Sequence, residues 1–241
     1  AVETVTYTIT ATGPGPESCV APATQTYTVT VNPPVRQTIT NNDAVVCEGV
    51  AVNITYTTPT ANGTIVVTAV YPAGVTGSVD YNANPSAPAA NGTVTETLSN
   101  TNSTSQTVVY TFTASGNGCA QAVTTTSVTV HPTPTFTNLP ATAPICSGDQ
   151  LSFTPTSDVA GTVFTWTVVT TGNITGHTAT GSGAITHTLV NTGNAVETVT
   201  YTITATGPGP ESCVAPATQT YTVTVNPPVR QTITNNDAVV C

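Results

Sequence analysis

Cysteines are the residues of this sequence whose type and spacing most strongly suggest chemistry. There are six, and they recur regularly along the chain: Cys19, Cys47, Cys119, Cys146, Cys213 and Cys241. None of them forms the C-x-x-C pair that is typical of a zinc site. Regular cysteines in an acidic, β-rich chain predict disulfide bonds, which form and persist in oxidising, extracytoplasmic compartments. Free buried thiols are the simpler alternative.

Two pairings of these cysteines are open. One lies within domains and joins Cys47 to Cys119 and Cys146 to Cys213. The other joins neighbouring domains through Cys47 and Cys213. In a sandwich of strands rising ~3.3 Å per residue, the turns that carry the two cysteines of one domain lie roughly 25–30 Å apart. A disulfide requires Cα atoms within about 7 Å, which favours the bond between neighbours if the inferred topology holds.

The histidines and acids are weaker candidates for a chemical site than the cysteines. His131 lies in a predicted proline-rich linker. His177 and His187 are ten residues apart with no cysteine or second histidine at ligand spacing, so we expect solvated strand positions rather than metal ligands. Asp43 and Glu48, near a predicted domain end, are weak candidates for holding Ca²⁺ with backbone carbonyls, and solvated turn acids are the simpler interpretation. No G-x-S-x-G motif supports a catalytic triad. We therefore expect no enzyme activity, no catalytic residue and no cofactor.

The composition excludes several partners. The chain is 38% hydrophobic and 5% charged, with two basic residues against eleven acids and a net charge of −9. Phosphate binding is built from Lys and Arg, so nucleic acid is not an expected partner, and neither is an anionic lipid surface. No run of 18 apolar residues occurs, so we expect no membrane insertion.

Strand patterns run through the whole sequence. Segments such as "TVTYTITA" (198–205), "TYTVTVN" (220–226) and "TVVYTFTA" (107–114) alternate apolar residues with threonine, which is roughly a quarter of the chain. This alternation predicts antiparallel sheets with one apolar and one wet face. Proline cannot donate to a central ladder, so the proline-rich stretches at 32–35, 130–135 and 226–229 are predicted linkers about 100 residues apart.

The linkers and a perfect repeat define the domains. Residues 1–47 and 195–241 are identical, with an offset of 194. We expect complete β-sandwiches over 36–132 and 133–229, the C-terminal hairpin of a truncated sandwich over 1–35, and the first strand of a further domain over 230–241. The chain is then a window of a longer tandem array. The predicted fold is all-β, with tandem immunoglobulin-like sandwiches in a rod or fibre and Trp166 as a core aromatic.

The motifs "ICSG-x-x-L-S-F-T", "VFTWTV", "VTYTITA" and "YTVTVNP" resemble the PKD-like, immunoglobulin-like repeats of giant Bacteroidetes cell-surface proteins, including gliding adhesins exported by type IX secretion. The resemblance implies an extracellular, cell-surface, non-enzymatic stalk or filament that serves attachment or gliding. Its expected partners are neighbouring repeats of the same protein, together with surface glycans or other cells. The acidic "WDFGDG"-like stretch of calcium-binding variants is replaced by "TWTVVTTGN". The alternative is a carbohydrate- or partner-binding module, which an exposed row of aromatic residues would favour.

Overall fold

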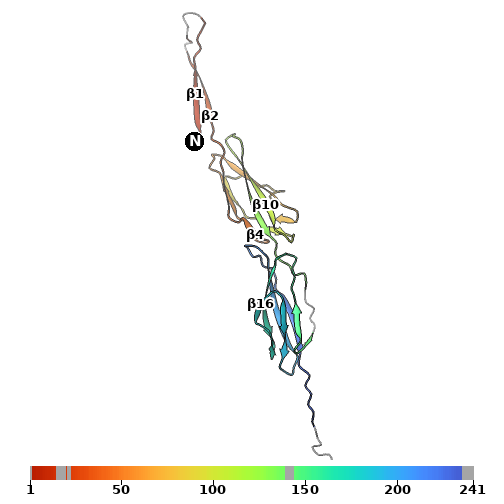
Figure 1. The fold of residues 1–241 in the computed structure, drawn as a ribbon. Helices are drawn as coiled ribbons and strands as arrows, with labels where there is room; N and C mark the ends of the chain where they lie inside the picture. The colour runs from red at the N-terminus through yellow and green to blue at the C-terminus, as the bar shows by residue number, and fades with distance from the viewer. Residues whose placement is uncertain (1, 15–19, 21–22, 139–143, 235–241) are drawn as a thin grey trace, which may run out of the picture. The chain divides into compact units, whose positions relative to one another are not determined.

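The structure, a computed structural model, describes residues 2–14, 20, 23–138 and 144–234. Every regular element among them is a β-strand (Figure 1), which confirms the all-β prediction. The described part of the chain contains no helix with the length and apolarity that a membrane span requires. The chain divides into two compact units, Ala1–Ser99 with Gln106–Val130 and Asn100–Ser105 with His131–Cys241.

The first sandwich packs a four-stranded sheet, in the order β4-β11-β10-β6, against two smaller sheets, β3-β5-β8 and β7-β9. Tyr110 and Phe112 on β10 are fully buried between these layers, together with Ile54 and Leu98 from the smaller sheets. Period-two alternation therefore directs one face of β10 to the core and its threonines outward. The strands are β3 (Thr38–Asn41), β4 (Val45–Cys47), β5 (Ile54–Thr57), β6 (Thr64–Val70), β7 (Val75–Gly77), β8 (Asn91–Val94), β9 (Leu98–Asn100), β10 (Gln106–Ser115) and β11 (Ala122–His131).

The second sandwich is built in the same way around a five-stranded sheet, β12-β20-β19-β14-β16, with the pairs β13-β17 and β15-β18. Trp166, the predicted core aromatic, lies on β14 and is 5% exposed. The short strand β12 runs parallel to the end of β20, whereas the long strands pair antiparallel. The strands are β12 (Ile145–Cys146), β13 (Gln150–Phe153), β14 (Val163–Thr170), β15 (Ile174–Thr175), β16 (Thr180–Ser182), β17 (Ile185–Thr188), β18 (Val190–Asn191), β19 (Glu197–Thr206) and β20 (Gln219–Asn226).

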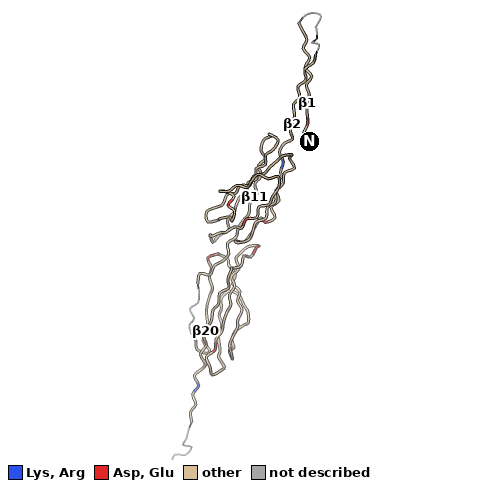
Figure 2. The backbone as a smooth tube through the Cα atoms, turned by 180° about the vertical axis from the view of Figure 1, so that it is seen from behind, with Lys and Arg blue, Asp and Glu red and all other residues tan. Residues whose placement is uncertain are grey.

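A two-stranded hairpin, β1 (Glu3–Ile9) and β2 (Gln25–Val31), precedes the first sandwich. No third strand joins it among the described residues (Figures 1 and 2). Its register places Tyr7 opposite Tyr27, as β19 and β20 place Tyr201 opposite Tyr221. The identical sequences therefore form the same hairpin twice. At the other end, residues 230–234 carry no strand, and the remainder of the strand expected over 230–241 lies outside the described residues.

Candidate functional site

Each sandwich holds a polar cluster on the same core tyrosine. The segments "TVTETLSN" (93–100) and "AITHTLVN" (184–191) fill matching places in the two folds, as do "VVYTFTA" (108–114) and "VTYTITA" (199–205). Glu96 therefore corresponds to His187, and Tyr110 to Tyr201. Both pairs are in hydrogen-bond contact. Each sandwich thus places a polar side chain, fully buried in Glu96 and half-buried in His187, against one core tyrosine hydroxyl.

In the first sandwich, Glu96 is fully buried. Its carboxylate accepts hydrogen bonds from the hydroxyls of Tyr71, at 2.8 Å, and Tyr110, at 2.5 Å. The amide of Tyr81 in turn donates to the Tyr71 oxygen at 3.0 Å. Burial, and then the hydrogen bond to Glu96, raise the pKa of both Tyr71 and Tyr110, so both hydroxyls stay protonated and able to donate. These bonds offset part of the cost of burying a carboxylate.

The second sandwich places an imidazole where the first has a carboxylate. His187 Nδ1 lies 2.7 Å from the Tyr201 hydroxyl, and the two rings stack with their centroids 5.7 Å apart. Trp166 meets His187 edge to face at 5.2 Å. Burial, and to a smaller extent the neighbouring His177, lower the pKa of His187. The expectation that His187 is a solvated strand residue is therefore wrong, because it shares its inward face with buried Ile185 and Leu189.

The other titratable candidates are not brought together. His131 contacts the Ser105 hydroxyl, and the Nδ1 atom of His177 is buried without a hydrogen-bond partner. The Asp43 amide donates to the Asn41 side chain, and Glu48 accepts a hydrogen bond from Ser99. In the described part of the chain, no group of three or more His, Cys, Asp or Glu residues could hold a metal ion, so the calcium candidates Asp43 and Glu48 gain no third ligand from this set.

The cysteines fall into two classes. Cys47 and Cys213 are disulfide-bonded, whereas Cys119 and Cys146 are free thiols. The intradomain pairings Cys47–Cys119 and Cys146–Cys213 are therefore wrong, and Cys119 and Cys146 are not the disulfide cysteines expected from the sequence. The pairing of Cys47 with Cys213 stays a prediction. Cys19 and Cys241 lie outside the described residues.

The length of a strand explains the failed intradomain pairing. Strand β4, which ends at Cys47, lies beside the C-terminal part of β11, where the Thr129 amide donates to the Ala44 carbonyl. Cys119 lies in the turn before β11 begins at Ala122. Ten residues of β11 at ~3.3 Å each hold the two thiols roughly 30 Å apart, well beyond the reach of a disulfide.

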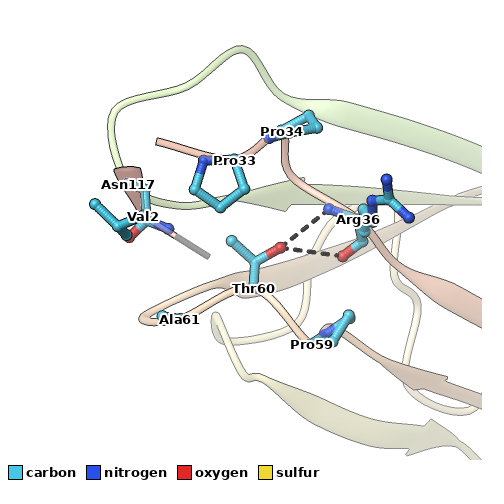
Figure 3. Close-up of a pocket in the computed structure, with 8 residues that line it drawn as sticks. All are labelled: Val2, Pro33, Pro34, Arg36, Pro59, Thr60, Ala61 and Asn117. Atoms are coloured by element: carbon cyan, nitrogen blue, oxygen red, sulfur yellow. Dashed lines mark hydrogen bonds between the residues drawn. The ribbon is translucent and has the colours of Figure 1, made fainter. Parts of the chain in front are cut away.

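A pocket of about 360 Å³ lies where the hairpin joins the first sandwich (Figure 3). The Arg36 amide donates to the Thr60 hydroxyl at 3.0 Å, and the Arg36 guanidinium points away from Pro33 and Val2. No acid, histidine or cysteine lines it, so the pocket has no acid–base pair for catalysis. The lining residues are Val2, Pro33, Pro34, Arg36, Pro59, Thr60, Ala61 and Asn117.

The remaining candidate is a surface. The hairpin carries an exposed apolar face, here called the hairpin face, which includes the two exposed aromatic residues Tyr7 and Tyr27. An isolated hairpin, as expected for a truncated sandwich over 1–35, has no second sheet against which to bury Tyr7, Ile9 and Val29. The hairpin face consists of Val5, Tyr7, Ile9, Tyr27, Val29 and Val31.

Residues 143–229 match the model of the PKD-like domain family. No curated protein sequence matches the chain. Among solved structures, DIP-gamma IG1+IG2 is similar with 8% identity over 83% of this chain and 100% of that chain, at a TM-score of 0.43. A titin I67–I69 variant has 10% identity over 85% of this chain and 70% of that chain, at a TM-score of 0.42.

An Escherichia coli alpha-2-macroglobulin has 12% identity over 92% of this chain, at a TM-score of 0.35, and this chain covers 24% of its length. These structural likenesses are too weak to carry an argument about function. The family match coincides with the second sandwich, and a disulfide is typical of domains in an oxidising compartment. Residues 143–229 therefore form an immunoglobulin-like domain of PKD-like sequence, which together with the disulfide fits an extracellular protein.

Proposed function

We propose that this chain is a non-enzymatic structural repeat in the stalk or filament of a giant extracellular adhesin, of the kind that Bacteroidetes display for attachment or gliding. The observation that carries the proposal is the 47-residue sequence that recurs after 194 residues and pairs in the same register both times. Because the repeat carries its own strand pairing, further copies can be added end to end without a change in sequence. The expected partners are then the neighbouring repeats.

The surface of the sheets supports a mechanical role. Threonines face each other across the outer side of the long strands, as in Thr107–Thr129 at 3.4 Å and Thr200–Thr222 at 3.2 Å. Such cross-strand pairs contribute roughly 0.2–1 kcal/mol each. Threonine therefore keeps the solvent face strongly β-forming while the chain carries only 5% charged residues. This surface stabilises the sheet and presents few charged groups for recognition.

A carbohydrate-binding module is the second candidate, because a depression of about 470 Å³ lies over Trp166. Its rim consists of threonines, which could donate to sugar hydroxyls. However, Trp166 is 5% exposed and packs edge to face against His187 and Tyr201, so its ring is not available for stacking on a sugar. In the described parts of the two sandwiches, no Phe, Tyr or Trp is among the exposed large hydrophobic residues. This favours the structural role.

Two measurements on the native protein test the proposal. Immunogold labelling with an antibody against the second sandwich should mark cell-surface projections at regular intervals, and deletion of one 194-residue step should shorten the projections by a constant length. The purified chain should bind no glycan on an array. Two results together would contradict the stalk function and favour a binding module. These are selective glycan binding that is lost on Thr165→Ala and Thr180→Ala, and cell-surface projections of unchanged length after repeat deletion.

A further inference from the structure

The same sequence is buried in one place and exposed in another. Residues 3–31 and 197–225 are identical and pair in the same register. Tyr7 is 54% exposed and Tyr27 63% exposed, whereas their counterparts Tyr201 and Tyr221 are 0% and 7% exposed. Because the two hairpins share sequence and pairing, the difference in exposure of their tyrosines arises from what packs on each hairpin. The second sandwich therefore supplies a template for whatever covers the hairpin face.

In the second sandwich, residues 150–188 cover both tyrosines with specific contacts. The ring centroids of Tyr201 and Trp166 lie 5.8 Å apart, and the Tyr201 hydroxyl lies 2.7 Å from His187 Nδ1. Tyr221 meets Phe153 at a ring distance of 5.2 Å. These partners belong to the strands β13, β14 and β17. The template is thus a surface of aromatic rings and one imidazole that contacts two tyrosines specifically, and it is more than an apolar cover.

The edges of the hairpin are open as well. In the second sandwich, β14 pairs along β19, and Ile145 and Cys146 of β12 pair with Val225 and Asn226 at the end of β20. The Asn191 side chain also donates to the Val225 carbonyl at 3.0 Å. No described strand pairs with the outer edges of β1 and β2. Unpaired strand edges favour the addition of further strands.

The tail after the second sandwich shows the same behaviour at the other end of the repeat. Residues 33–39 and 227–233 are identical. Val35 is 7% exposed and Ile39 packs against the core of the first sandwich, whereas Val229 is 99% and Ile233 83% exposed. In both cases the repeated sequence is buried where the complementary part of the fold is present. The exposure of Val229 and Ile233 therefore depends on what packs against them and not on the sequence itself.

We propose that the hairpin face binds a segment equivalent to residues 144–191, supplied by the neighbouring repeat on its amino-terminal side. The bound segment places an imidazole on the Tyr7 hydroxyl, a phenyl ring on Tyr27, and strands on both open edges. The hairpin then forms the last two strands of a complete sandwich. The proposal rests on the proposed function, because a tandem array is what supplies such a neighbour.

The test joins a second copy of residues 133–194 in front of Ala1 and follows amide hydrogen exchange. Thr8→Ser and Thr26→Ser, on the threonine side of the hairpin, distinguish its peptides by mass from the identical peptides of β19 and β20. We expect the amides of Glu3–Ile9 to exchange at least about 100-fold more slowly in the extended chain than in the original chain, and to approach those of the β19–β20 hairpin.

The control is the same extension with Leu151→Asp and Ile185→Asp in the added copy alone, which should leave the hairpin amides fast. Rapid exchange in the unaltered extension overturns the proposal, whether or not the added segment folds. Protection of the original chain that appears with dimerisation also overturns it, because a second copy is then the occupant. Protection in the extended chain without repeat-dependent projections on cells would leave the proposed completion intact and remove only the stalk function.

Discussion

Glu96 and His187 lie at equivalent positions of the two sandwiches, and each contacts the hydroxyl of the same core tyrosine, Tyr110 in one and Tyr201 in the other. A carboxyl group and an imidazole thus fill one structural role. Each forms a hydrogen bond with a buried tyrosine hydroxyl. What the two domains share is a polar partner for the tyrosine hydroxyl at this point of the core, whereas the chemical type of that partner differs.

The first prediction concerns Glu96. Glu96→Ala should destabilise the first sandwich by about 3 kcal/mol or more, because it removes the acceptor of the buried Tyr110 hydroxyl and of the half-buried Tyr71 hydroxyl and opens a cavity. Urea unfolding of the full chain, read by hydrogen exchange of the β10 amides, measures the change. The matched control is Thr95→Ala at an exposed neighbouring position, where we expect a change within about 0.5 kcal/mol. Equal stability of Glu96→Ala and the wild type would contradict the assigned role.

The second prediction is a pH dependence confined to the second sandwich. Burial holds the folded-state pKa of His187 below its ordinary value of 6.5, so the unfolded state binds more protons between these two values. Stability from this group is therefore complete above about pH 6.5 and decreases as the pH falls through the folded-state pKa. Fluorescence of Trp166, the single tryptophan, reports the melting temperature. His187→Gln should flatten the profile between pH 7.5 and 5, and an unchanged profile in this variant would exclude His187 as the cause.

Period-two alternation was sufficient to predict long strands such as β10, β19 and β20, because they follow from local pattern. The burial of Trp166 was predicted from the place of a core aromatic in an immunoglobulin-like sandwich. The same alternation could have placed Glu96 inward, since it lies between β8 and β9, two residues from each of the buried Val94 and Leu98. Its burial was not predicted, because an acid in a threonine-rich segment is usually solvated. The free state of Cys119 and Cys146 could not be read from the sequence, since it depends on which ends of the strands meet in space.

The third prediction concerns the contact between Gly181 and Trp166. A Cβ atom at Gly181 would overlap the indole ring, whose position is fixed by His187 and Tyr201. Gly181→Ala should therefore destabilise the second sandwich by about 1–3 kcal/mol, as expected for overpacking. The melting transition followed by Trp166 fluorescence measures this. Ser182→Ala, at the exposed neighbouring position, serves as the control, and equal effects of the two substitutions would show that the indole is free to move.

The last prediction concerns the thiols. Without reduction, an alkylating reagent should label Cys146, which is exposed, faster than Cys119, which is half-buried, and should leave Cys47 and Cys213 unlabelled. After denaturation, trypsin can cut only after Arg36 and Arg230, so Cys19 and Cys241 separate from the other four cysteines. If Cys47 and Cys213 are joined to each other, the peptide 37–230 carries two labels and one internal disulfide. A covalent link from this peptide to 1–36 or 231–241 would instead show that Cys47 or Cys213 is bonded to a cysteine of the repeated ends, and the predicted Cys47–Cys213 bond would be wrong.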